Sequence, residues 1–144
     1  AVLGAEVFDR AYHTFLSEWR YRHPYPWDLW RTFERVSGRD LGWFWRGWYF
    51  ETWTLDQAVA SVVGDGDDAV IVIEDRGDLP MPVDLTITLR DGRVVRESLT
   101  VDVWLSGSRT ASVSAAYGVP VERVEIDAGT EFPDTDRANN VWPR

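Results

Sequence analysis

The chain has 144 residues, 44% of them hydrophobic, so it can bury a core and is too apolar to be wholly disordered. It contains no cysteine, which excludes a disulfide framework, a thiolate nucleophile and cysteine-ligated zinc. The net charge is −9, and residues 51–144 hold eight arginines against eighteen acids, so nucleic acid would be repelled from most of the chain.

Residues 5–22 are predicted to form a helix, because apolar residues recur there at three-and-four spacing. His23-Pro24 should end this helix, since the residue before proline avoids the helical region. The apolar stripe consists of Val7, Phe8, Ala11, Tyr12, Phe15, Leu16 and Trp19.

Two further helices are predicted before residue 50. Pro26 suits the first turn of a helix, where its missing N–H is not needed, and Ser37-Gly38 is a typical stop. Asp40 can then cap a short third helix over residues 41–49.

From Thr52 onward the apolar period shifts towards two. Val83, Leu85, Ile87 and Leu89 alternate with polar residues, and the following Asp91-Gly92 favours a hairpin turn. We expect strands at 52–62, 69–75, 83–90, 94–103, 110–116 and 121–127, and an irregular tail from 132. This pattern predicts an α+β chain: two or three helices over residues 1–50, then an immunoglobulin-like antiparallel β-sandwich over 51–144.

The chemistry-bearing residues do not converge on an active site in the sequence. His13 and His23 are the only histidines, and two isolated histidines make a poor zinc site. We interpret His13 as a surface residue and His23 as a residue at the helix end. No nucleophile elbow and no phosphate-binding glycine loop is present, so no catalytic, cofactor-binding or metal-binding residue is assigned.

Two acidic loops carry the oxygen ligands that calcium prefers, without the spacing of an EF-hand. They could equally be a solvated turn and a segment that hydrogen-bonds its own backbone. The first loop is Asp65-Gly66-Asp67-Asp68, and the second contains Asp134, Asp136, Asn139 and Asn140.

Tryptophan is concentrated in the predicted helices. Because three short helices cannot hide so many large rings, we expect these tryptophans to form an interdomain or self-association surface. A platform of exposed rings that stacks on sugars is the alternative. The candidate residues are Trp19, Trp27, Trp30, Trp43, Trp45 and Trp48.

The run from His23 to Leu41, followed by Trp43-Phe44-Trp45-Arg46-Gly47-Trp48, resembles the end of the catalytic region in the aminopeptidase N (membrane alanyl aminopeptidase) family of gluzincins. The start Leu3-Gly4-x-Glu6-x-Phe8 is similar too. In the β part, the resemblance to bacterial members lies in Pro80 to Leu85, Asp91-Gly92, Trp104, and Phe132 to Asn140. One departure is Tyr25, where members often carry a capping threonine.

The resemblance implies that residues 1–50 are the helical end of a thermolysin-like catalytic domain and that residues 51–144 are the β-sandwich domain that follows it. The parent protein would hold zinc through two histidines and a glutamate, use a second glutamate as general base, and remove N-terminal residues from peptides. Those residues would precede Ala1, and none is matched here. The chain itself is expected to bind no cofactor.

The expected partners are therefore the rest of the parent catalytic domain and, for the parent, a peptide substrate. No nucleic acid is expected, and no apolar run reaches the ~20 residues of a membrane span. We expect a fragment that self-associates through residues 1–50, as a two-fold dimer. The missing cysteines are compatible with a periplasmic or extracellular location but do not indicate one. The alternative function is a β-sandwich module that binds a polysaccharide or a protein.

Overall fold

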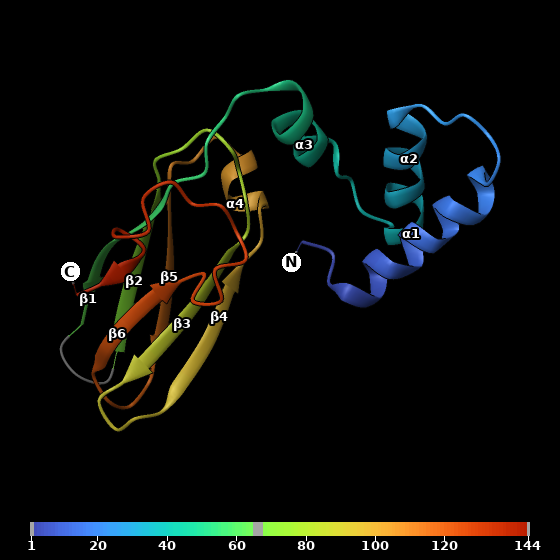
Figure 1. The fold of residues 1–144 in the computed structure, drawn as a ribbon. Coiled ribbons are helices and arrows are strands. Elements are labelled where there is room, and N and C mark those ends of the chain that lie inside the picture. The colour runs from blue at the N-terminus through green and yellow to red at the C-terminus, as the bar shows by residue number, and fades with distance from the viewer. Residues whose placement is uncertain (1, 65–67, 144) are drawn as a thin grey trace. The chain divides into compact units, whose positions relative to one another are not determined.

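A computed structural model describes residues 2–64 and 68–143, which form two compact units that divide between Thr52 and Trp53 (Figure 1). Helices come first and antiparallel strands follow, so the chain has the α+β organisation that the sequence predicts. None of the described helices is both long and apolar enough to cross a membrane.

The first unit is built from α1 (Ala5–Trp19), α2 (Pro26–Ser37), α3 (Gly42–Trp45) and a π-helical turn, η1 (Arg46–Phe50). The α1 helix packs on α2, and the small core of the unit consists of Ala11, Phe33, Leu41 and Trp45. The α1 helix ends three residues before the predicted Arg22, because Tyr21 adopts a left-handed φ of 63°.

Both predicted ends of α2 are confirmed. The helix begins at Pro26, and the carboxylate of Asp28 accepts a hydrogen bond from the Tyr25 backbone N–H at 2.9 Å. The Tyr25 side chain makes no cap hydrogen bond, and the Asp28 carboxylate partly compensates at this end of the helix. The third helix differs slightly from expectation: Leu41 is its N-cap, while Asp40 Oδ1 accepts the Gly42 N–H at 2.8 Å.

Gly38 ends α2 in the left-handed conformation, with φ 68° and ψ 16°, and its N–H donates to the Glu34 carbonyl. A Cβ at this position would touch nothing within 4 Å, so the cost of Gly38→Ala is conformational. We expect Gly38→Ala to destabilise the helical unit by about 1 kcal/mol, measured by denaturant unfolding followed by tryptophan fluorescence. Gly38→Asn should cost less, since asparagine tolerates this conformation, and equal costs for the two variants would contradict the explanation.

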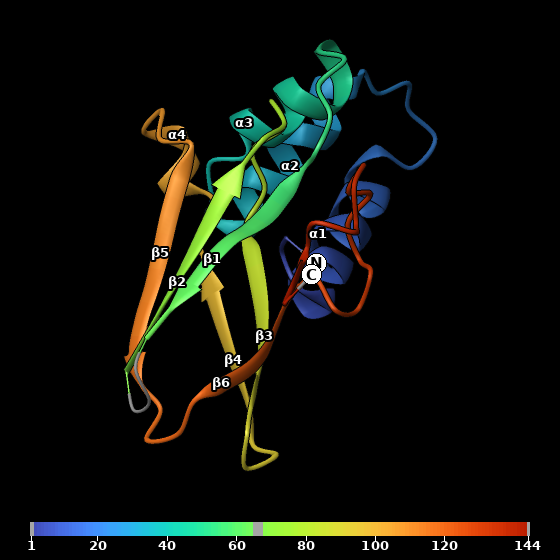
Figure 2. The same ribbon diagram turned by 90° about the vertical axis from the view of Figure 1, so that its left-hand side faces the viewer.

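The second unit is a sandwich of two antiparallel sheets, ordered β1-β2-β5 and β4-β3-β6-β7, as in an immunoglobulin-like fold (Figure 2). Alternate residues of β3 face the core, and Val83, Leu85, Ile87 and Leu89 are almost fully buried. The strands are β1 (Gln57–Val63), β2 (Asp68–Asp75), β3 (Val83–Leu89), β4 (Val94–Leu99), β5 (Thr110–Ala116), β6 (Val121–Ile126) and β7 (Val141–Trp142).

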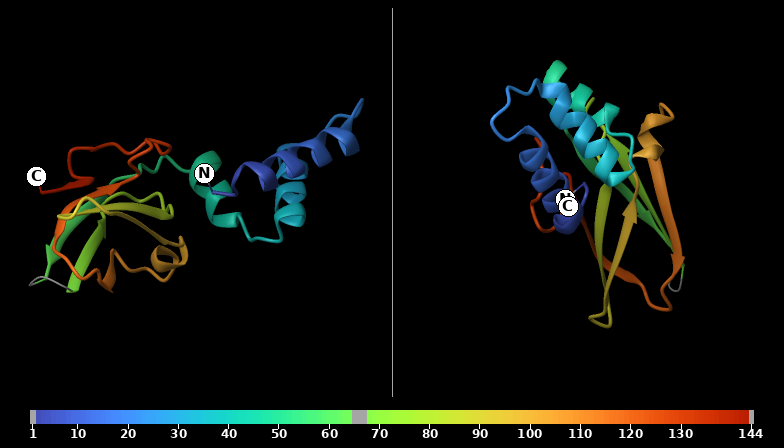
Figure 3. Two further views of the ribbon diagram at one scale, coloured as in Figure 1. Left: turned by 90° about the horizontal axis from the view of Figure 1, so that it is seen from below. Right: turned by 90° about the vertical axis from the view of Figure 1, so that its right-hand side faces the viewer.

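The predicted hairpin joins β3 to β4 at the end of the sandwich opposite α4 (Asp102–Leu105) (Figure 3). Gly92 has φ 86° and donates its N–H to Leu89, while Asp91 accepts the N–H of Arg93 at 3.0 Å. A left-handed residue at this position gives the turn a backbone twist that matches the twist of the two strands, and glycine adopts this conformation without strain.

Three strand predictions were wrong in detail. The first strand starts at Gln57, not at residue 52, because residues 54–56 bond to loops instead of to a strand. The fourth ends at Leu99, not at residue 103, because the chain turns into α4. The tail contains β7, which pairs with β6.

The α4 turn explains the early end of β4. It places Trp104 in the core at 5% exposure, where its Nε1–H donates to the Met81 carbonyl at 2.8 Å. Gln57 Nε2 donates to the same carbonyl at 2.9 Å. The loop before β3 and the turn after β4 are thereby joined inside the sandwich.

Candidate functional site

The tryptophans of the helical unit form a layer of rings around Trp45. Trp30 stacks on Trp45 with ring centroids 5.8 Å apart, and Phe33 and Phe44 meet Trp45 edge to face at 6.1 and 5.2 Å. Both indole nitrogens, of Trp30 and Trp45, are buried without a hydrogen-bond partner in the described part of the chain. Ring packing, not hydrogen bonding, therefore fixes these side chains.

The structure brings four of the six candidate tryptophans into this layer. Trp45 is buried, and Trp30 and Trp43 are half-buried. Trp48 is 39% exposed, and both Trp43 and Trp48 contact the ring of Phe44. Trp27 makes its ring contact with Tyr25 instead, and Trp19 lies half-buried near the end of α1.

Two exposed rings of the same layer, Tyr49 and Phe50, were missed by the sequence interpretation. Both meet Trp30 edge to face at 5.4 Å, although 56% of Tyr49 and 68% of Phe50 remain exposed. The run of aromatic residues from Trp43 to Phe50, interrupted only by Arg46 and Gly47, could have signalled them. We call Trp30, Phe44, Trp48, Tyr49 and Phe50 the aromatic surface.

The ring geometry favours protein packing over sugar stacking. A sugar platform needs open ring faces lying side by side, whereas rings of the aromatic surface mostly meet edge to face. Tyr25 and Trp27 are the most exposed parallel pair, but they stack on each other at 4.6 Å with an interplanar angle of 9°. Each ring therefore covers one face of the other.

Zinc does not fit the residues that the structure describes. His13 and His23 are both exposed, and residues 2–64 and 68–143 contain no group of three or more histidine, aspartate or glutamate side chains that could hold a metal ion. The first acidic loop lies mostly at residues 65–67, outside the described part of the chain.

The second acidic loop uses its side chains on the protein's own backbone. Asp134 accepts the N–H groups of Gln57 and Asp136 at 2.9 and 3.0 Å. Asp136 accepts the Ala138 N–H and the Asn139 amide at 3.2 and 3.1 Å. These bonds favour the structural interpretation of this loop over a calcium site.

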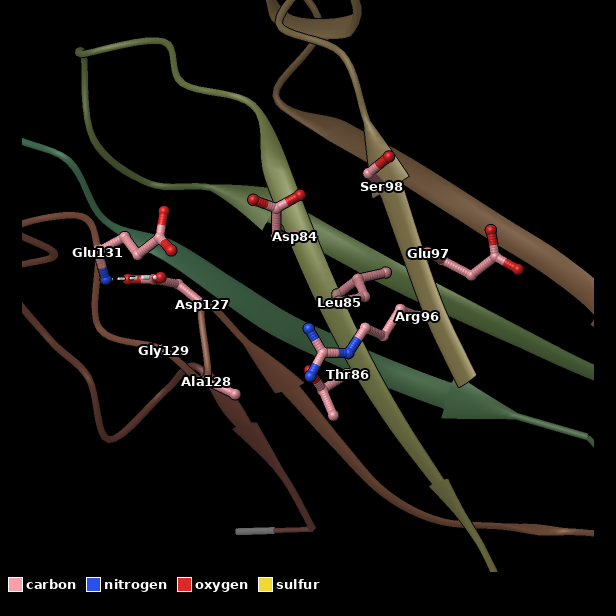
Figure 4. Close-up of a pocket in the computed structure, with 10 residues that line it drawn as sticks. All are labelled: Asp84, Leu85, Thr86, Arg96, Glu97, Ser98, Asp127, Ala128, Gly129 and Glu131. Carbon is pink, nitrogen blue, oxygen red and sulfur yellow. Dashed lines mark hydrogen bonds between the residues drawn. The ribbon is translucent and has the colours of Figure 1, made fainter. Parts of the chain in front are cut away.

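A depression of about 380 Å³ on the sandwich is lined by four carboxylates from three segments of the chain (Figure 4). They are Asp84 on β3, Glu97 on β4, and Asp127 and Glu131 after β6. Burial, and then the charges of Glu131 and Asp127, raise the pKa of Asp84. The Asp127 carboxylate already has structural partners, since it pairs with Arg137 at 3.0 Å and accepts the N–H groups of Glu131 and Phe132. Its role is to hold the turn after β6.

The most perturbed acid of the sandwich is Asp75, at the end of β2. Burial raises its pKa to about 6, against the opposing charge of Arg109, and Asp78 and Asp56 raise it further. Arg109 lies 3.4 Å from Asp75 Oδ2, while Oδ1 is buried and has no hydrogen-bond partner in the described residues. Arg109 also donates to the Gly77 carbonyl and to Asp78, so its charge is shared.

No protein-family model matches the chain, and no curated protein is detectably similar to it.

Proposed function

We propose that this chain is a non-catalytic C-terminal scaffold of a zinc-dependent aminopeptidase, and that the parent protein hydrolyses N-terminal residues from peptides. The helical unit would close the wall of the catalytic domain, and the sandwich would follow as a rigid module. The parent's zinc would be held by residues outside this chain.

The observation that carries the proposal is the aromatic surface. Tyr49 and Phe50 are more than half exposed while they pack on a half-buried Trp30. Large apolar rings gathered on so small a unit usually mark a surface that another protein part covers. The run His23 to Trp48, which carries the resemblance to aminopeptidase N, contains most of these rings.

The first test is the gene sequence upstream of the codon for Ala1. A His-Glu-x-x-His helix with a downstream glutamate, within a few hundred codons, would support the proposal. If that signature is absent, the alternative of a β-sandwich module that binds a protein or a polysaccharide becomes the leading hypothesis.

The second test compares side-chain oxidation by hydroxyl radicals in the 144-residue chain and in the parent protein. We expect Tyr49 and Phe50 to be protected severalfold in the parent, because the catalytic domain would cover them. Leu105, which is 48% exposed on the sandwich, is the internal reference. Equal oxidation of Tyr49 and Phe50 in both samples would contradict the scaffold proposal.

A further inference from the structure

The outer edge of β5 is the one strand edge of the sandwich, among the described residues, that has neither charges nor a cover nor a bulge. An open edge presents unpaired N–H and C=O groups, and proteins usually protect it with charges, bulges, short strands or covering segments. In the three-stranded sheet β5 pairs with β2 alone (Figure 2).

The other edges carry such protection. The β1 strand has a register shift between Val59 and Ser61, and the Val59 N–H donates to the tail carbonyl of Asn139 at 3.0 Å. The β4 strand carries Arg96 and Glu97, and β7 is two residues long. In contrast, the seven residues Thr-Ala-Ser-Val-Ser-Ala-Ala of β5 include no charge and no proline.

The sequence of β5 is also self-complementary. Residues 111–115 read Ala-Ser-Val-Ser-Ala, which is a palindrome about Val113. In an antiparallel pair of two copies with Val113 on the two-fold axis, Ala111 would face Ala115 and Ser112 would face Ser114. Ser112 and Ser114 are exposed, while Ala111, Val113 and Ala115 are half-buried on the core side.

We propose that β5 is a homodimer interface, in which two copies of the chain join their three-stranded sheets into one six-stranded sheet. Small apolar residues would extend the core face, and the serine hydroxyls would pair on the solvent face. The palindrome selects a second copy of this chain as the occupant. This proposal does not depend on the parent being an aminopeptidase.

The net charge of −9 on each copy opposes the association at low ionic strength. Because a single strand pair buries little area, we expect a weak dimer with a dissociation constant below about 1 mM. Salt should strengthen it, since raising the ionic strength from about 0.02 to 0.3 M shortens the range of the repulsion.

The test is sedimentation equilibrium of the 144-residue chain and two matched double variants at concentrations up to about 1 mM. Ser112→Glu/Ser114→Glu sets like charges opposite each other across the axis, and we expect a dissociation constant raised at least about tenfold. Ser112→Arg/Ser114→Glu sets opposite charges across the same axis, and we expect it to keep the dimer. Both changes lie on exposed positions of one strand, so folding should be unaffected.

Val94→Glu is the control and should leave the dimer intact, because Val94 lies on the β4 edge, is 57% exposed and pairs with the uncharged Thr88. A chain that remains monomeric at about 1 mM would overturn the proposal. So would a dimer that the Glu/Glu variant leaves unchanged, because the contact would then lie elsewhere, as in the expected association through residues 1–50.

Discussion

Replacing Trp104 by alanine should destabilise the sandwich unit by about 3–5 kcal/mol, the usual cost of emptying the site of a buried tryptophan. The ring is 5% exposed, and its indole N–H donates to the Met81 carbonyl at 2.8 Å. The change therefore removes both a large apolar volume and the hydrogen bond that docks α4.

Two companion variants separate these contributions. Trp104→Phe keeps most of the volume, and Met81 still accepts from Gln57, so we expect a loss of about 1–2 kcal/mol. Leu105→Ala changes the neighbouring residue, which is 48% exposed, and should cost less than about 1 kcal/mol.

The measurement should be amide hydrogen exchange in β3 and β6, because six of the nine tryptophans lie in the helical unit and would dominate fluorescence. A loss below 1 kcal/mol for Trp104→Ala would mean that α4 does not anchor the core.

The stability of the sandwich should increase as the pH falls from 7.5 to 4.5, to the extent that Asp75 controls it. Its folded pKa of about 6 exceeds the ordinary 3.8, so the folded state binds the proton more tightly. The stabilisation is complete below the unfolded pKa and is lost as the pH rises through 6. Over this range the linkage amounts to about 2 kcal/mol.

Asp75→Asn fixes the neutral form of the side chain and removes this titration. The difference in unfolding free energy, variant minus wild type, should be about 2 kcal/mol larger at pH 7.5 than at pH 4.5. Asp78→Asn is the matched control, because Asp78 contacts the same Arg109 but is 65% exposed. The difference in unfolding free energy for Asp78→Asn should change much less with pH. If the difference for Asp75→Asn does not change with pH either, the pKa of Asp75 is not raised by burial.

The parts of the fold that could be predicted are those with a local cause. Pro26 and Gly38 fix the ends of α2 through their own backbone preferences, and Asp91-Gly92 fixes the hairpin. The alternation from Val83 to Leu89 reflects one buried face. Each of these signals acts over a few residues, so it can be recognised in the sequence without knowledge of the tertiary structure.

The α4 turn could not be predicted because Leu99, Val101 and Val103 continue the alternation of a strand. The extended conformation ends because Val101 turns helical, and the α4 turn that follows is held by a bond from Trp104 to the distant Met81 carbonyl. The candidate surface shows the same limit: the tryptophans were predicted, but π-helical geometry at Arg46–Phe50 brings Tyr49 and Phe50 onto Trp30. Asp84, Asp127 and Glu131 meet only through the pairing of β3 with β6.

The segment that leads into β1 is fastened to two separate loops of the sandwich. The Thr54 carbonyl accepts the N–H groups of Asp78 and Leu79 at 3.0 and 3.1 Å, and the Leu55 carbonyl accepts the N–H of Thr135 at 2.9 Å. Gly77 lies so close that a Cβ there would sit 2.1 Å from the Thr54 carbonyl oxygen.

A pulling force that arrives through the backbone at Thr52 would therefore reach several hydrogen bonds in parallel before it could peel β1 from β2. Strands loaded at a single bond open one bond at a time, whereas bonds that share a load must break together. A pulling force applied to the helices would therefore be resisted by the hydrogen bonds of the first residues of the sandwich.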